Sequence, residues 1–493
     1  MRRPLIGVLF FTLAHAAIAF CEQPAEEFSA RKFVEKTKGR QAYGIYLDGA
    51  KIGWGVDDFQ LGEFKGRQVA IAKEESYMAI KTEDEDSTFR TEGRTIYDLE
   101  GDGVILFHET KSVEDGTETI VTARRTDDDF EITTKNGRRR TVRKVDHPKE
   151  TLKESYGLMS WIESEPPADE RFTEHTLDLD LDDINSKTVY SYDRKETVRW
   201  GGVSVDAYHV KMLMHGLTAT ALVTSDGKII RGKMGPLMEI RAEEEAVAKK
   251  LDGATVDMMA TGSVVVKRDI GRPHRVDSLL LRVDGLGDVA LPESHRQKLE
   301  RGENGETILA LRRDFEKPIG DTLSDEEKKQ LTSPSTNIQS NHKSITKLAK
   351  RLVGHETAPL AKARKIHRWI GKNLRPSYSS NASTALGVLE TRAGDCTEHA
   401  LLFVALARAA GIPAREVTGL AYANEDPPIF AWHAWAEIHD GRQWISIDPM
   451  WQQVFVDATH IKFSDSPDDW GWMQLVGQLK IEILDFSRAD DDE

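Results

Sequence analysis

The sequence predicts an α+β protein, in which an antiparallel β-rich region precedes a C-terminal domain of helices followed by strands. Two observations support this fold class. Asp-Gly and Asn-Gly pairs are strong signals for tight hairpin turns, and eight of them lie before residue 320. After Asp325 the apolar residues recur at helical spacing, and a further hairpin pattern follows these helices. The eight pairs are Asp48-Gly49, Asp102-Gly103, Asp115-Gly116, Asn136-Gly137, Asp226-Gly227, Asp252-Gly253, Asp284-Gly285 and Asn304-Gly305.

Length and composition narrow the class of protein further. The chain has 493 residues, which suggests about three domains at ~150 residues each. A formal net charge of −15 argues against nucleic-acid binding, because a basic face is needed to neutralise phosphates. Two cysteines exclude a disulfide scaffold and a zinc site built from several thiolates. The sequence lacks a P-loop and the G-x-S-x-G and H-E-x-x-H patterns, so we expect no cofactor and no metal.

The first residues have the pattern of a secretory signal. Arg2 and Arg3 precede a short apolar run, and small residues follow it up to Ala19. We therefore predict a signal peptide over 1–19 and an exported protein, periplasmic or extracellular, without a membrane span. Lipid attachment at Cys21 is the less favoured alternative, because the bulky Phe20 precedes this cysteine.

The β-rich region is expected to divide once. Between the turn pairs run strand-like stretches such as Thr119 to Ala123, and a helical stretch from Glu150 to Ile162 ends before Pro166-Pro167. This helix is a plausible boundary, so we predict β-rich domains at 28–165 and 166–335. A catalytic domain is expected at 336–486, followed by an acidic tail at 487–493.

Cys396 lies at the predicted start of a helix. Asp395 is a favourable N-cap residue, and Glu398 three positions later completes a capping-box pattern. The apolar run continues to Ala410 and ends at Gly411. Free backbone N–H groups and the positive end of a helix favour a thiolate and are suited to holding an oxyanion. A nucleophilic cysteine is therefore expected here.

A hairpin downstream supplies the base that a cysteine nucleophile needs. Residues 430–438 and 443–449 are typical of two strands, and Asp440-Gly441 has the sequence of a two-residue turn. With this turn, counting back along both strands places His433 directly opposite Asp448 on one face of the hairpin. One extra residue in the turn would shift this pairing.

These three residues suggest a division of roles. Cys396 would act as the thiolate nucleophile, His433 as the general acid and base, and Asp448 as the carboxylate that orients the imidazole. Such a trio suits acyl transfer, in which attack on an amide carbonyl gives a thioester and water or an amine then accepts the acyl group.

The C-terminal region resembles the bacterial transglutaminase-like superfamily over about residues 340–462. The resemblance rests on GDCTEHA at 394–400, RAAGIPAR at 408–415, HAWAE at 433–437, Trp444 and Asp448-Pro449. It implies a papain-like α+β core and a Cys-His-Asp triad on Cys396, His433 and Asp448. It also implies a protein or peptide substrate, while the reaction stays open because this superfamily includes cross-linking, proteolysis and amide hydrolysis.

Hydrolysis is favoured over amine cross-linking, because water is the default acceptor of an exposed thioester. The alternative function is a binding or envelope-assembly protein with a vestigial transglutaminase-like domain, which the length of the β region motivates. The oligomeric state is not predicted.

Overall fold

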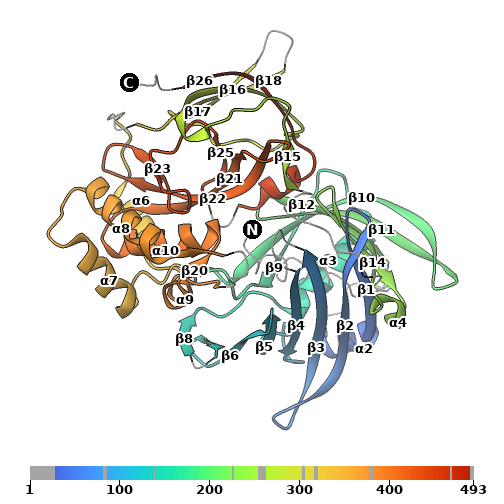
Figure 1. The fold of residues 1–493 in the computed structure, drawn as a ribbon. Coiled ribbons are helices and arrows are strands. Elements are labelled where there is room, and N and C mark those ends of the chain that lie inside the picture. The colour runs from blue at the N-terminus through green and yellow to red at the C-terminus, as the bar shows by residue number, and fades with distance from the viewer. Residues whose placement is uncertain are drawn as a thin grey trace, which may run out of the picture. The chain divides into compact units, whose positions relative to one another are not determined.

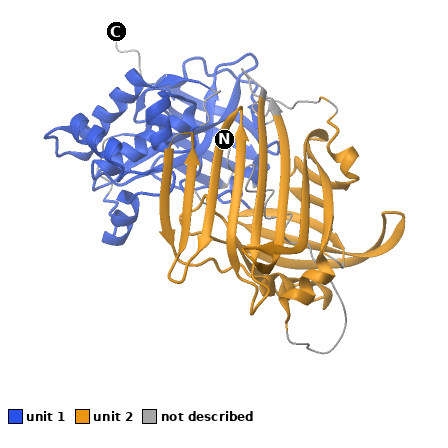
Figure 2. Cartoon of the chain, turned by 90° about the horizontal axis from the view of Figure 1, so that it is seen from below, with its two compact units in different colours: residues 1–3, 83–85, 258–493 blue, residues 4–82, 86–257 orange. Residues whose placement is uncertain are grey.

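The chain forms two compact units, coloured separately in Figure 2. The computed structural model describes residues 28–81, 86–137, 139–224, 227–251, 253, 262–301, 306–315, 320–377, 382–466 and 469–488. We call the described residues up to 253 the N-terminal unit and those from 262 onward the C-terminal unit. The predicted signal peptide at 1–19, Cys21 and residues 489–493 of the predicted tail lie outside the described residues.

The N-terminal unit is built on a 14-stranded sheet with the order β8-β7-β6-β5-β4-β3-β2-β1-β14-β13-β12-β11-β10-β9. All of its strand pairs are antiparallel, as the sequence predicts. Two meanders join where β1 pairs with β14 (Figure 1). The strands are β1 (Gly39–Leu47), β2 (Ala50–Phe64), β3 (Arg67–Lys81), β4 (Asp86–Tyr97), β5 (Ile105–Glu114), β6 (Thr117–Arg125), β7 (Phe130–Asn136), β8 (Arg139–Val145), β9 (Phe172–Leu177), β10 (Asn185–Trp200), β11 (Val203–Met214), β12 (Leu217–Thr224), β13 (Ile229–Met234) and β14 (Met238–Glu243).

Local signals account for several of these hairpins. The predicted turns Asp48-Gly49 and Asp115-Gly116 connect β1 to β2 and β5 to β6. Both residues of each pair have positive φ, at 48° and 81° in the first turn and 46° and 81° in the second. This is the conformation of a type I′ turn, whose twist matches the flanking strands. Asn304-Gly305 lies outside the described residues.

Two helices pack against this sheet. Helix α2 (Ala30–Thr37) begins after the N-cap Ser29, and α3 (Leu152–Glu163) lies within the stretch predicted as helical. Their buried side chains share one core with strands from the middle and both ends of the sheet. Since α3 stands between β8 and β9, it connects the two edge strands of the same sheet. A short third helix, α4 (Glu245–Ala248), follows β14.

The strands of the two units are not divided at the predicted domain limits of 165 and 335. The 14-stranded sheet takes strands from both sides of residue 165. The described residues of 262–335 belong to the C-terminal unit, because β15 and β16 in that range pair with β22 and β26. That residues 28–165 and 166–335 fold as separate domains stays a prediction. Residues 487–488 of the predicted tail belong to β26.

The C-terminal unit contains two main sheets. One is six-stranded, with the order β24-β23-β22-β21-β25 and β15 paired to β22, and the other has the order β17-β18-β16-β26. Two short strands, β19 and β20, form a separate parallel pair. The strands are β15 (Val264–Val265), β16 (Val276–Asp284), β17 (Gln297–Arg301), β18 (Thr307–Arg312), β19 (Arg375–Pro376), β20 (Ala393–Gly394), β21 (Ala414–Ala423), β22 (Ile429–His439), β23 (Trp444–Asp448), β24 (Gln453–Val454), β25 (His460–Ser464) and β26 (Lys480–Arg488).

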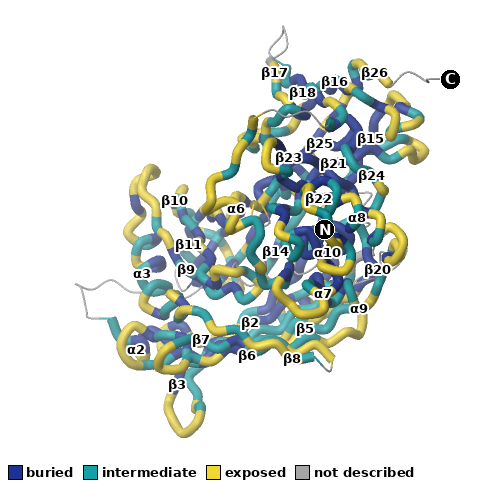
Figure 3. Tube along the Cα trace, turned by 90° about the vertical axis from the view of Figure 1, so that its left-hand side faces the viewer, coloured by how far each residue is buried: buried dark blue, intermediate teal, exposed yellow. Residues whose placement is uncertain are grey.

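Helices cover one side of the six-stranded sheet (Figure 1). The helix α10 is apolar nearly all round, and its residues 398–407 are all buried. It packs between α7 and α8 on one side and strands β21 and β22 on the other, in one hydrophobic core. In Figure 3 most of β21, β22 and β25 is drawn as buried. The helices of this unit are α6 (Asp325–Thr332), α7 (Lys343–Val353), α8 (Pro359–Asn373), α9 (Ala385–Thr391), α10 (Cys396–Ala409) and the 3-10 turns η1 (Pro273–Arg275) and η2 (Gly471–Leu475).

The described part of the chain holds no helix with the length and apolar character needed to cross a membrane.

Gly419 on β21 is needed where three strands approach closely. It pairs with His433 of β22 on one side and with Lys462 of β25 on the other. A Cβ at this position would lie 1.9 Å from the backbone oxygen of Ile461, a contact that real atoms do not make. We therefore expect Gly419→Ala to lower the free energy of unfolding by about 2–3 kcal/mol, measured by urea titration.

Gly387→Ala in α9 is the matched control for this substitution. Its Cβ would meet its nearest neighbours at 3.3 Å, and alanine favours a helix over glycine by about 1 kcal/mol. A Gly419→Ala variant as stable as Gly387→Ala would contradict the close approach.

Candidate active site

Cys396 is the first residue of α10, as the sequence predicts. The Asp395 carboxylate accepts a hydrogen bond from the Thr397 N–H at 2.8 Å, and Glu398 Oε2 accepts one from the Asp395 N–H at 2.8 Å. This is the expected capping box, which fixes the start of the helix and the place of the thiol. Cys396 is a free thiol and is partly exposed.

His433 and Asp448 come together from neighbouring strands. His433 lies on β22, and its Nε2–H donates to Asp448 Oδ2 over 2.8 Å. The backbone N–H groups of Met450 and Trp451 donate to the second oxygen, Oδ1, at 2.8 and 2.9 Å. Both side chains are buried, and Asp448 has no exposed surface. The carboxylate is therefore held on both oxygens and orients the imidazole.

The register of this hairpin differs from the prediction. Asp440 Oδ1 accepts hydrogen bonds from the N–H groups of Arg442 and Gln443, so that residues 440–443 form a four-residue connection. His439 consequently pairs with Trp444 rather than with Arg442, and the expected position of Asp448 directly opposite His433 is wrong by two residues. A shift of two residues leaves each side chain on its original face, because side chains alternate with a period of two. The two residues meet as diagonal neighbours.

The pKa of His433 is set by burial and by its two charged neighbours. Burial alone lowers the pKa of this imidazole, but the Asp448 carboxylate and Cys396, through charge and hydrogen bonding, raise it to about 10. Since Nε2 is bonded to Asp448, Nδ1 is the ring nitrogen that remains for the thiol. The ring of Trp451 stacks on the imidazole with centroids 4.2 Å apart and planes inclined by 17°, which restricts its rotation.

A second histidine contacts the Asp448 carboxylate. His460, the first residue of β25, is fully buried, and its Nε2 lies 3.4 Å from Asp448 Oδ2. Its Nδ1 lies 3.2 Å from Asp457 Oδ1. Burial raises the pKa of each carboxyl, but the attraction of His433 for Asp448 and of His460 for Asp457 keeps both pKa values well below their usual range. The His460 ring thus lies between the Asp448 and Asp457 carboxylates and contacts both.

Nothing in the sequence predicted these last two residues, because no spacing rule connects His460 or Asp457 to the hairpin. Donor atoms of His433, Asp448 and His460 lie within 4.8 Å of one another. Each of these atoms already takes part in the hydrogen bonds above, so the grouping is a hydrogen-bond network. His399, one turn after Cys396, is also buried, and its Nδ1 bonds the Asp395 carbonyl at 2.7 Å.

Comparison with known proteins agrees with this geometry. Residues 346–449, which contain the start of α10 and the hairpin, match the model of the transglutaminase-like superfamily. The C-terminal unit contains a transglutaminase-like domain. The predicted α+β class with a C-terminal domain of this family is thereby confirmed.

Part of the chain is also similar to an individual curated protein. An uncharacterized protein of Haemophilus influenzae is 44% identical over 78 residues, which are 14% of this chain and 20% of that protein. The chain thus spans about a fifth of the length of the curated relative it matches.

Three solved structures are similar to parts of the chain. A candidate cysteine protease from Cytophaga hutchinsonii has 21% identity and a TM-score of 0.30, over 44% of this chain and 88% of that one. The periplasmic domain of TgpA from Pseudomonas aeruginosa has 16% identity and a TM-score of 0.25, over 41% and 87%. A candidate protease from Parabacteroides distasonis has 13% identity and a TM-score of 0.18, over 76% and 68%.

Proposed function

We propose that this protein is an exported cysteine acyl-transfer enzyme that acts on amide or peptide bonds of protein substrates. Its catalytic residues are Cys396, His433 and Asp448. One observation carries the proposal: a partly exposed thiol at a helix start helps to raise the pKa of a buried imidazole, and a buried carboxylate holds this imidazole at 2.8 Å. This is the arrangement of an activated nucleophile, its base and the group that orients the base.

The first half of the reaction requires a negatively charged Cys396 thiolate and a protonated His433. The Cys396 thiolate attacks the amide carbonyl carbon and forms a C–S bond, while the carbonyl oxygen becomes an oxyanion. The tetrahedral intermediate collapses, the C–N bond breaks, and the leaving amine takes the proton that His433 held. The acyl group remains on Cys396 as a thioester.

The second half regenerates the thiol. His433, now neutral, removes a proton from water as the water oxygen attacks the thioester carbonyl, and the C–S bond then breaks. The products are a carboxylic acid and the Cys396 thiolate, with the proton on His433. Hydrolysis is favoured over cross-linking because water is the default acceptor at a partly exposed thiol.

The oxyanion needs donors near the sulfur. The side-chain oxygens of the Asp395 capping box accept from the first-turn N–H groups of Thr397 and Glu398. For the Cys396 N–H no acceptor is found among the described residues, and this group also lies at the positive end of α10. We assign it as an oxyanion donor, in the manner of preorganised backbone amides in acyl-transfer enzymes.

A thiol-reactive amide probe tests the activation of Cys396. In the full chain at pH 6, iodoacetamide should alkylate Cys396 at least tenfold faster than it alkylates a free cysteine, which ionises near pH 8.5. His433→Ala should remove this advantage, and Cys396→Ala should leave only the slow labelling of Cys21. Ordinary alkylation that is unaffected by His433→Ala would instead favour the alternative, a non-catalytic binding or envelope-assembly protein.

Trapping the acyl-enzyme tests turnover and the acceptor. Denaturing the protein in acid after brief exposure to a cell extract should preserve a thioester on Cys396, identifiable by mass spectrometry. Incubation with a glutamine donor and a labelled amine then separates hydrolysis from cross-linking. Robust amine incorporation would overturn the preference for hydrolysis.

Replacing His460 tests its role as a positioning residue for Asp448. His460 helps to keep the pKa of the Asp448 carboxyl below its usual range, and His460→Gln removes this contribution. Asp448 then supports the His433 imidazolium, and with it the thiolate, less firmly, so the pH–rate profile of Cys396 alkylation should move to higher pH by about 0.5–1 unit on its acid side. A fall in rate at every pH without this displacement would mean that His460 serves packing alone.

His439→Gln is the matched control for the His460 experiment. His439 is a buried histidine at the far end of β22, where its Nδ1 accepts the Gly441 N–H at 3.1 Å. This substitution should leave the profile in place.

Export rests on the pattern of the first residues. Fractionation of cells that produce the full chain should find a protein shortened by residues 1–19 outside the cytoplasm. A chain that retains these residues in the cytoplasm would contradict export.

A further inference from the structure

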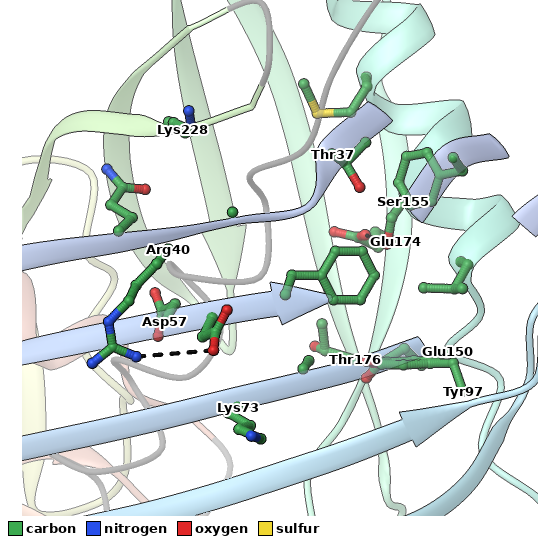
Figure 4. Close-up of a pocket in the computed structure, with 18 residues that line it drawn as sticks. Thr37, Arg40, Asp57, Lys73, Tyr97, Glu150, Ser155, Glu174, Thr176 and Lys228 are labelled. Carbon is green, nitrogen blue, oxygen red and sulfur yellow. Dashed lines mark hydrogen bonds and ion pairs between the residues drawn. The ribbon is translucent and has the colours of Figure 1, made fainter. Parts of the chain in front are cut away.

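The N-terminal unit contains a pocket of about 910 Å³, counting the space that opens to solvent (Figure 4). Residues of β1 to β4 in the sheet line it, together with residues of α2, α3 and β9. Its apolar lining comes from Phe33, Phe59, Ala72, Leu152 and Met159.

One end of this pocket is acidic and carries no basic partner. Glu174 on β9 is buried, and its two oxygens accept hydrogen bonds from the hydroxyls of Ser155 at 3.0 Å and Tyr190 at 2.9 Å. Glu150 accepts a hydrogen bond from Tyr97 and one from the Leu177 N–H at 2.6 Å. Among the described residues, no lysine, arginine or histidine forms an ion pair with Glu174 or Glu150. A carboxylate offers about four acceptor positions, so Glu174 keeps two for a ligand.

A second observation at the same end also indicates a missing partner. Thr176 lies two residues after Glu174 on β9, so the two side chains share a face of this strand. It lines the pocket and is 8% exposed, yet its hydroxyl finds no hydrogen-bond partner among the described residues. Buried hydroxyls are rarely left without a partner, because the loss of water is then uncompensated.

We propose that this pocket binds an amphipathic organic amine, with its apolar body against Phe33 and Phe59 and its ammonium group between Glu174 and Thr176. An ammonium group donates three hydrogen bonds, and both the Glu174 oxygens and the Thr176 hydroxyl accept them. The ligand thus supplies the positive charge that this buried acid lacks. The proposal concerns the N-terminal unit alone and does not depend on the proposed function.

The charges at the other end of the pocket explain why an amine is preferred over an acid. The Arg40 guanidinium is occupied by Glu245 at 2.8 Å and also lies 3.9 Å from Asp58. Figure 4 shows Arg40 and Lys73 apart from Glu174, Ser155 and Thr176, so these cations do not serve the buried end. A ligand carboxylate placed there would face Glu150 and Glu174 without a cation.

Three ligands that share one apolar body test the choice of headgroup. The full chain is titrated by calorimetry with 4-phenylbutylamine, 4-phenylbutanol and 4-phenylbutyrate at pH 8. We expect the amine to bind at least tenfold more tightly than the alcohol and the acid to bind most weakly. An acid that binds as tightly as the amine, or an amine that fails to bind at millimolar concentration, would overturn the proposal.

Three variants test whether the amine binds in this pocket and contacts Glu174. Glu174→Gln keeps the shape of the side chain and removes its charge, so affinity for the amine should fall about tenfold while affinity for the alcohol is unchanged. Glu170→Gln is the matched control, because Glu170 accepts a hydrogen bond from the Trp161 indole N–H at 2.6 Å and does not line the pocket. Ala72→Phe fills the cavity and should abolish binding of both ligands. Unchanged amine binding in Glu174→Gln would refute the assignment.

The wild-type chain gives a second measurement that does not depend on a variant's folding. Burial raises the pKa of Glu174 to about 7, although Tyr190 and Ser155 oppose this by hydrogen bonding. The amine stays protonated across this range, so its affinity should rise about tenfold from pH 6 to pH 8 as Glu174 ionises, whereas affinity for the alcohol should stay constant. A flat profile for the amine would contradict the role of Glu174. The other ionisable groups that face Glu174 or the pocket are Glu150, Glu154, Tyr97, Tyr190, Arg40, Asp57, Asp58, Lys73 and Lys228.

Discussion

Replacing Asp448 with asparagine should lower kcat/KM for an amide substrate by about 10²–10⁴-fold, and the rate of Cys396 alkylation at pH 7 by about ten- to thirtyfold, because an ordinary cysteine keeps about 3% thiolate at this pH. The asparagine side chain fits the same space and can accept the hydrogen bond from His433 Nε2. It removes the negative charge that stabilises the imidazolium, so burial of the ring, which lowers its pKa, is no longer opposed by this carboxylate. His433 then loses its proton near neutral pH, and the thiolate loses its counter-ion.

The interaction between His433 and Asp448 also sets how the stability of the protein changes with pH. Asp448 and Cys396 raise the pKa of His433 to about 10, above the value of about 6.5 for an unfolded chain. The stability from this interaction is therefore fully present below pH ~6.5 and is lost as the pH rises through about 10. In Asp448→Asn the alkaline side of the pH profile of kcat/KM, which requires the His433 imidazolium as proton donor, should move down toward neutral pH.

Asp440→Asn is the control for this prediction. Asp440 is a carboxylate in the connection of the same hairpin, partly exposed, and its substitution should leave the profile within about twofold of wild type. Alkylation is compared at temperatures where thermal unfolding shows each variant to be folded. An Asp448→Asn protein with wild-type alkylation at pH 7 would remove Asp448 from the proposed triad.

The start of α10 could be predicted because the signals for it are local. Asp395, Cys396 and Glu398 lie within one turn of helix, and the hydrogen bonds of a capping box join residues only three apart. The proximity of His433 and Asp448 was predicted with an incorrect register. Their proximity was still predicted correctly, because strand side chains alternate between faces and a shift of two residues leaves each one on its original face.

Contacts between distant segments could not be predicted in this way. His460 reaches Asp448 because β25 pairs with β21 rather than with its sequence neighbour β24. The pairing of β16 with β26 joins residues some two hundred positions apart and places 276–284 in the same unit as the thiol. Similarly, β1 pairs with β14 across most of the N-terminal unit. No turn residue or local periodicity specifies such pairings. They depend on the burial of apolar side chains by the assembled sheet.

Replacing Glu437 with glutamine should lower the free energy of unfolding of the C-terminal unit by about 3–5 kcal/mol at pH 7, because Arg415 and the buried Lys462 then keep only the partly exposed Asp465 as an acidic partner. Glu437 is 3% exposed and lies on β22, on the same face as His433. Arg415 donates two hydrogen bonds to its Oε2 at 2.9 and 2.7 Å, and Lys462 Nζ contacts Oε1 at 3.1 Å. The carboxylate therefore connects β22 to β21 and to β25.

The effect should depend on pH in a defined direction. Burial raises the pKa of Glu437, but Lys462 and Arg415 outweigh it and lower the pKa to about 2. Because this pKa lies below the unfolded value of about 4.3, the stabilisation is present above pH ~4 and is lost as the pH falls toward 2. Urea unfolding of wild type and Glu437→Gln should therefore differ most at neutral pH and converge near pH 2.

Three comparisons make the Glu437 prediction specific. Glu482→Gln, at an exposed glutamate that pairs with Arg282, should cost less than about 0.5 kcal/mol. Adding Lys462→Met to Glu437→Gln should restore part of the loss, because it removes a buried cation that the first substitution leaves with only the partly exposed Asp465 as partner. Alkylation of Cys396 in folded Glu437→Gln should remain close to wild type, since Glu437 does not contact the imidazole. A large loss of alkylation with unchanged stability would instead assign Glu437 to the chemistry, and the HAWAE segment would then serve catalysis at both of its ends.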